Sequence, residues 1–157
     1  MYGLNIHQEI EKLKNSNLLK SDKDINDFEE AITRIVGVGD INCIKYLCAR
    51  FHDGTEHDEI MFGLIHAIES FDQNYPLYDT LKELAKSVPL MFPHAKEWAK
   101  TLHKRILNHK PTLEVYIDVV SRSETTTKNL IAEIVTEIKH KNPSRFEESA
   151  DRFLSSI

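Results

Sequence analysis

Apolar residues recur at intervals of three and four positions along almost the whole chain. This spacing places them on one side of an α-helix and predicts helices from end to end. Side chains that can cap a helix stand before the first three predicted helices, at Asn5, Ser21 and Asp40. Glycines at 37 and 39 should end the second helix. The apolar faces of these three helices are Ile6, Ile10 and Leu13; Ile25, Phe28, Ile32, Ile35 and Val36; and Ile41, Ile44, Leu47, Cys48 and Phe51.

Loops and prolines mark the remaining helices. Thr55 with Asp58 should open a fourth helix after the loop at 52–54, and a sixth should run from Pro93 to Asn108. The other predicted starts are Asn74 to Pro76, Pro111, Thr125 to Thr127, and Pro143. Inward-facing residues are Met61, Leu64, Ile65 and Ile68 on the fourth; Leu77, Leu81, Leu84 and Val88 on the fifth; Ala95, Trp98, Leu102 and Ile106 on the sixth; and Leu130, Ile131, Ile134, Val135 and Ile138 on the eighth.

These elements predict an all-α fold in a single domain that spans residues 1–157. Eight or nine helices joined by short loops pack as antiparallel neighbours. Two architectures remain open, a HEAT- or armadillo-like α-solenoid and a compact orthogonal bundle. Residues 113–120 are rich in β-branched side chains, but one strand cannot form a sheet, so we expect a helix there.

Composition indicates a protein of the cytoplasm. No run of 18 apolar residues occurs, and the N-terminus does not resemble a signal peptide. Cys43 and Cys48 lie in an apolar helical stretch, which is typical of small buried residues in a reducing compartment.

Charge is distributed unevenly along the chain. The net charge is -5, and residues 51–83 contain eight acidic side chains against one lysine. Proteins that bind phosphate backbones usually carry a basic excess, so nucleic acid is not expected as a direct partner. A basic protein suits this acidic block better.

Two groups of residues resemble metal or catalytic sites. Cys43, Cys48, His52 and His57 are zinc-ligand types, but two cysteines five residues apart lie about 140° apart around a helix and cannot both face one ion. The dipeptides His52-Asp53 and His57-Asp58 resemble ligands of HD-type phosphohydrolases, which need further ligands far away in sequence. We therefore expect no metal, no cofactor and no catalytic activity.

His66 and Glu69 share a face of the fourth predicted helix, three residues apart. They could form an acid–base pair. Alternatively, His66 is a buried histidine and Glu69 contacts a cation such as Arg105. We favour the second interpretation, a structural polar network of His66, Glu69, Arg105 and Asn108 that ties the fourth and sixth helices together.

Residues 53–108 resemble bacterial immunity proteins of polymorphic toxin systems, in particular the helical type known as immunity protein 30. Three stretches carry the likeness, namely Asp58 to Glu69 (DEIMFGLIHAIE), Pro93 to Ala99 (PHAKEWA) and Arg105 to Asn108 (RILN). The resemblance implies a protein that protects its producer by binding the C-terminal domain of a cognate toxin, with no cofactor and no catalysis. Such toxins are often basic nucleases, and an EndoU-type ribonuclease is one candidate.

The expected function is therefore inhibition of a toxin through a one-to-one complex. The partner-binding residues should be the exposed acids Asp53, Glu56, Asp58, Glu59, Asp79 and Glu83, which antiparallel helices could bring onto one surface. Two alternatives remain, a helical-repeat adaptor and a metal-dependent hydrolase.

Overall fold

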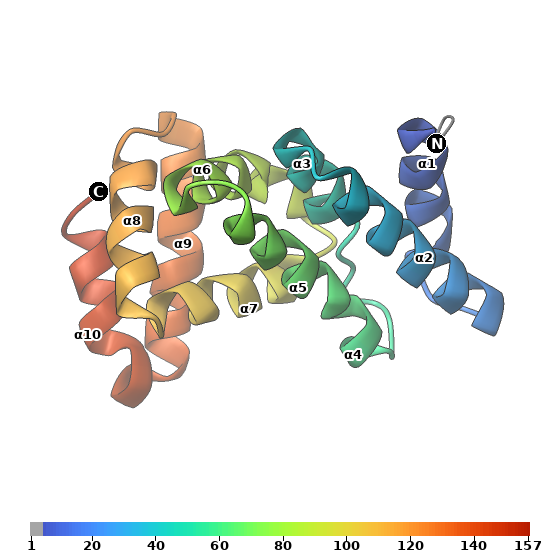
Figure 1. Cartoon of the computed structure of the whole chain (residues 1–157). Coiled ribbons are helices and arrows are strands. Elements are labelled where there is room, and N and C mark those ends of the chain that lie inside the picture. The colour runs from blue at the N-terminus through green and yellow to red at the C-terminus, as the bar shows by residue number, and fades with distance from the viewer. Residues whose placement is uncertain (1–4) are drawn as a thin grey trace.

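The computed structural model describes residues 5–157, which are predominantly helical and contain no strand, so the all-α prediction is confirmed (Figure 1). The α-helices are α1 Ile6–Ser16, α2 Asp22–Val38, α3 Ile44–Cys48, α4 Asp58–Met61, α5 Gly63–Ser70, α6 Leu77–Ser87, α7 Lys96–Leu107, α8 Lys110–Ser121, α9 Thr125–Lys141 and α10 Pro143–Leu154. Short 3₁₀ segments occur at Ile41–Cys43 (η1), Phe71–Gln73 (η2) and Val88–Met91 (η3).

The helices follow one another from one end of the molecule to the other. In Figure 1 the α1–α2 hairpin forms one end, and α8, α9 and α10 form the other. Between them α2 packs on α5, α3 on α5 and α6, α6 on α8, and α7 on α8 and α9. Because most contacts join elements that are close in the chain, this arrangement favours the solenoid alternative over a compact bundle.

The predicted caps at the first two helices are present. The Asn5 side chain accepts from the backbone N–H groups of His7 and Gln8, and Ser21 accepts from that of Asp24. Gly39 ends α2 in the left-handed conformation, with φ of 74°. Asp40 accepts from the N–H of Asn42, but the third helix begins with the 3₁₀ turn η1 before α3.

Two predicted helix starts are wrong. Thr55 does not cap the fourth helix, which follows His57 and is divided into α4 and α5 at Phe62. Phe62 keeps right-handed helical angles, so the two parts run on almost continuously. The sixth helix begins at Lys96 rather than Pro93, after a segment that contains η3 and the Phe92–Pro93 peptide.

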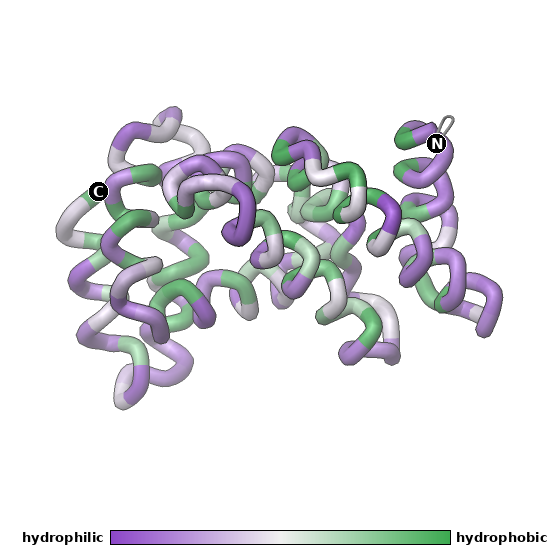
Figure 2. Tube along the Cα trace, viewed as in Figure 1, coloured by the Kyte–Doolittle hydropathy of each residue, from purple (hydrophilic) through white to green (hydrophobic). Residues whose placement is uncertain are grey.

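Every α-helix contributes apolar side chains to one continuous buried core. The smallest contributions come from α1 and α4, which supply Leu13 and Met61. Hydrophobic and hydrophilic stretches alternate along the helices in Figure 2, as expected for amphipathic helices packed against neighbours. Residues 113–120 belong to α8 and supply five buried side chains, which confirms the helical prediction there. None of the helices within residues 5–157 is long and apolar enough to cross a membrane.

Candidate functional site

An exposed row of side chains runs along α4, α5 and η2. Asp58, Phe62, His66, Glu69 and Asp72 recur every three or four residues, and all of them are exposed or half-buried. Residues with this spacing share one side of a helix. We call these five residues the α5 stripe.

The α7 residue Arg105 lies across the middle of this stripe. Its Nε and Nη2 atoms donate to the two carboxylate oxygens of Glu69 at 2.8 and 2.7 Å, and the guanidinium lies 5.3 Å from the centre of the Phe62 ring. Donation of these hydrogen bonds to Glu69 raises the pKa of Arg105, so the guanidinium stays charged. The pair ties α5 to α7 at the surface, because both side chains are about 40% exposed, at 41% for Glu69 and 42% for Arg105.

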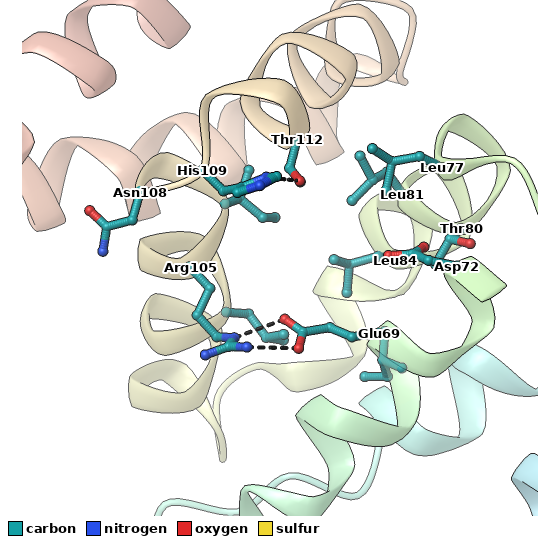
Figure 3. A pocket seen from close by; sticks show the side chains of 13 residues that line it. Glu69, Asp72, Leu77, Thr80, Leu81, Leu84, Arg105, Asn108, His109 and Thr112 are labelled. Atoms are coloured by element: carbon teal, nitrogen blue, oxygen red, sulfur yellow. Dashed lines mark hydrogen bonds and ion pairs between the residues drawn. The ribbon is translucent and has the colours of Figure 1, made fainter.

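The rest of the predicted polar network differs from expectation. His66 is exposed rather than buried, and its ring packs against the edge of Phe62 with 4.9 Å between ring centres. The reason is helical phase, since His66 falls on the outer side of α5 while its apolar neighbours Ile65 and Ala67 face inward. Asn108 is exposed too, and Figure 3 shows its amide turned away from the Glu69–Arg105 pair.

A cleft of about 440 Å³ lies at the η2 end of the stripe, between α5, α6, α7 and α8 (Figure 3). Leu77, Leu81 and Leu84 of α6 form an apolar wall, and Glu69, Asp72 and Arg105 bring charge to its edge. On the α8 side, His109 Nδ1 lies 2.7 Å from Thr112 Oγ1. The cleft is therefore apolar along one wall and charged at its edge.

Asp72 is the carboxylate of the cleft that has no cationic partner among the described residues. Much of the residue is open to solvent, but partial burial of the carboxyl group raises its pKa. The neighbouring Thr80 hydroxyl opposes this rise, and the Glu69 carboxylate adds to it. Thr80 Oγ1 is buried and makes no hydrogen bond of standard geometry in the described structure. Within residues 5–157, Asp72 takes part in no ion pair.

Asp53, predicted to bind a partner, makes a structural contact within the fold. Its carboxylate oxygens accept from the backbone N–H groups of Glu97 at 3.0 Å and Trp98 at 3.3 Å, and its own N–H donates to the His94 carbonyl at 2.9 Å. The residue at the start of α7, Ala95, has no side chain that can cap. Asp53 therefore caps α7 from a loop 44 residues earlier in the chain.

The other predicted partner-binding acids fall into two groups. Glu56, Asp58 and Glu59 are exposed around the start of α4 and make no ion pairs within the described residues. Asp79 and Glu83 lie on α6, which begins at the opposite end of α5 from α4 (Figure 1). Glu83 is also 3.6 Å from the Lys86 ammonium. Along the chain, α5 separates these two groups.

A buried polar pair between α7 and α8 was not predicted. His103 is only 1% exposed, with Nδ1 2.6 Å from the Ala99 carbonyl oxygen and Nε2 2.8 Å from the Tyr116 hydroxyl. The Ala99 carbonyl can only accept, so Nδ1 carries the proton and Nε2 accepts from Tyr116. Burial lowers the pKa of His103 to about 4 and raises that of Tyr116. His103 is therefore a neutral core residue.

The remaining metal-ligand types are separated. Cys43 and Cys48 are both buried and unpaired with each other, and burial raises the pKa of the Cys48 thiol to about 12. His52 Nδ1 accepts from the Gly54 N–H, and His94 Nε2 lies 3.3 Å from the Ala49 carbonyl oxygen. Across residues 5–157, no group of three or more His, Cys, Asp or Glu side chains is arranged to hold a metal ion.

Comparison with known families identifies the chain. The family model for immunity protein 30 matches residues 14–116, about two thirds of the sequence. The chain belongs to the immunity protein 30 family. The match is wider than the resemblance at residues 53–108, because it begins near the end of α1 and reaches α8. Neither a curated protein nor a solved structure matches the chain. The matched region of this immunity protein contains the whole α5 stripe and the cleft.

Proposed function

We propose that this immunity protein binds the C-terminal domain of a cognate bacterial toxin and neutralises it in a one-to-one complex. The observation that carries the proposal is the family match over residues 14–116. The protein acts by binding alone, in the cytoplasm of the producing cell, without a cofactor and without catalysis. It contacts neither nucleic acid nor membrane.

The contact surface includes the acids at the start of α4 and the α5 stripe. Glu56, Asp58 and Glu59 carry three exposed negative charges that no ion pair of the described structure neutralises. Next to them, Phe62 and Arg105 provide an aromatic and a guanidinium group, both enriched at the centres of protein interfaces. Acids at the edge of an interface mainly accelerate association with a basic partner.

Asp79 and Glu83 form a second acidic site on α6 that an extended partner also reaches. A nuclease with a basic active-site cleft, such as an EndoU-type ribonuclease, is the class of toxin that this charge suits. An acidic inhibitor matches such a cleft by occupying the region that normally holds the nucleic acid phosphates.

Co-expression tests the proposal. The toxin domain encoded beside this protein is produced in a bacterial host with and without the immunity protein, and the toxin domain with its active site inactivated serves as the control. We expect growth arrest by the toxin alone, rescue by co-expression, and a one-to-one complex by light scattering after size-exclusion chromatography. Growth arrest without rescue and no complex between the purified proteins would contradict the proposal.

A further inference from the structure

We propose that the cleft between α5, α6, α7 and α8 is an anchor site for a single basic side chain, an arginine or a lysine, of the toxin. This inference rests on the proposed function and adds the chemistry of one contact. It follows from the shape of the cleft, from its charge and from its position at the end of the α5 stripe.

The shape of the cleft suits a long side chain with an apolar stem. Leu77, Leu81 and Leu84 are spaced four and three residues apart, so they form one continuous apolar wall on α6 (Figure 3). The volume of about 440 Å³ lies within the range of sites that enclose a ligand group. Lysine and arginine place their methylene groups on such surfaces while the charged end reaches polar groups.

The cleft is lined by two carboxylates, Glu69 and Asp72, and by one guanidinium, Arg105. Arg105 already forms two hydrogen bonds with Glu69, so those two charges balance. Asp72 remains without an ion-pair partner within residues 5–157 and lies beside the leucine wall. The Asp72 carboxylate would repel an incoming anion, and an apolar side chain would cover this carboxylate without pairing it.

The position of the cleft allows a bound partner to close it. Glu69 and Asp72 belong both to the cleft and to the α5 stripe, so an interface over the stripe would cover the cleft opening. Exclusion of water would strengthen the attraction between Asp72 and the partner's cation. A covered, paired charge of this kind is expected to slow dissociation rather than to accelerate association.

A titration of the isolated protein tests the cleft without any toxin. Butylguanidinium carries the stem and the charge of arginine, butanol carries the stem alone, and butyrate carries the opposite charge. We expect butylguanidinium to shift the backbone NMR signals of Thr80, Leu81 and Arg105 in a saturable way, with weaker effects of butanol and butyrate.

The Asp72→Asn variant should weaken binding at least about fivefold, whereas Asp118→Asn should not. Asp118 lies on α8 and forms a surface ion pair with Arg122. Equal binding of butanol, or unchanged binding to Asp72→Asn, would overturn the proposal and leave an apolar cleft.

The same variants are then compared in the toxin complex. Asp72→Asn should raise the Kd at least about tenfold, mainly through faster dissociation, and Asp118→Asn should leave it unchanged. A complex that forms with equal Kd for Asp72→Asn would overturn the anchor site but leave the proposed function standing. Failure of the unaltered protein to bind toxin would refute the proposed function, and the butylguanidinium titration would still decide the chemistry of the cleft.

Discussion

At the scale of single residues, Asp53 illustrates how a side chain with an apparent binding role can have a structural one. Its two carboxylate oxygens receive N–H groups from the first turn of α7, a helix whose own starting residues provide no cap. A carboxylate in this position also lies at the positive end of the helix dipole. Asp53 therefore stabilises α7 and holds the 52–54 loop against it.

Replacement of Asp53 by alanine should lower the free energy of unfolding by about 1–2 kcal/mol, because two backbone N–H groups lose their acceptor. Chemical denaturation at neutral pH measures this loss. Glu56→Ala is the matched control, since Glu56 is an exposed acid three residues away with no ion pair in the described structure, and its stability should stay within about 0.5 kcal/mol. Equal stabilities of the two variants would show that the cap contributes little.

His103 makes the stability of the fold dependent on pH. Its pKa is about 4 in the folded protein, against 6.5 for an ordinary histidine, so the unfolded chain binds the extra proton more readily. The contribution of His103 to the free energy of unfolding is therefore fully present above pH 6.5. It decreases by about 3 kcal/mol as the pH falls from 6.5 to 4. Below pH 4 this group causes no further loss.

Comparison with the His103→Asn variant isolates this contribution from that of the carboxylates. The variant should be less stable at pH 7, and its stability should fall less than that of the unaltered protein between pH 7 and pH 4.5. Denaturation curves at both pH values give the difference, and NMR titration of the unaltered protein should find His103 unprotonated at pH 5. An identical loss of stability in both proteins would exclude His103 as the cause.

At the scale of secondary-structure elements, the Glu69–Arg105 pair joins α5 to α7 on the surface. Half-exposed ion pairs contribute little, because water already solvates both charges. A double-mutant cycle with Glu69→Gln and Arg105→Gln should therefore give a coupling energy of at most about 1 kcal/mol. The Glu114–Arg152 pair between α8 and α10 has the same two-bond geometry and provides the comparison, and its removal should likewise have little effect on stability. A coupling above about 3 kcal/mol would indicate that the pair is a buried structural link.

Elements could be predicted where their signals lie within a few residues of one another. Asn5 and Ser21 cap the helices that directly follow them, and the apolar spacing of α6 and α9 places Leu81 and Ile134 in the core. The start of α7 could not be predicted in this way, because its cap comes from Asp53 in another part of the chain.

The site was less predictable than the fold for the same reason. The pairing of Glu69 with Arg105 was anticipated from residue type, but the exposure of His66 depends on the phase of α5 relative to its neighbours. The cleft and the position of Asp72 at its edge depend on how four helices are placed relative to one another. Local sequence patterns do not determine that placement.

At the scale of the whole molecule, charge and shape combine on one side of a serial helical array. Asp58, one of the exposed acids near α4, begins the α5 stripe, and the cleft lies at its other end (Figure 1, Figure 3). The family match covers this region and ends within α8. Helices α9 and α10, which pack on each other, lie beyond it. A toxin bound along the whole stripe would therefore contact the acids near α4 at one end and the cleft at the other.

The most direct test of the central claim, that the toxin binds at this acidic face, is reversal of its charge. A variant with Glu56, Asp58 and Glu59 replaced by lysine is compared with one carrying the same change at Glu133, Glu147 and Glu148, exposed acids of α9 and α10. Both variants have the same net charge, and circular dichroism establishes that both are folded. Association with the cognate toxin is measured at low and moderate salt. The account predicts association at least about tenfold slower at low salt for the first variant only, with a smaller difference at moderate salt. Equal association rates and affinities for the two variants would place the interface elsewhere.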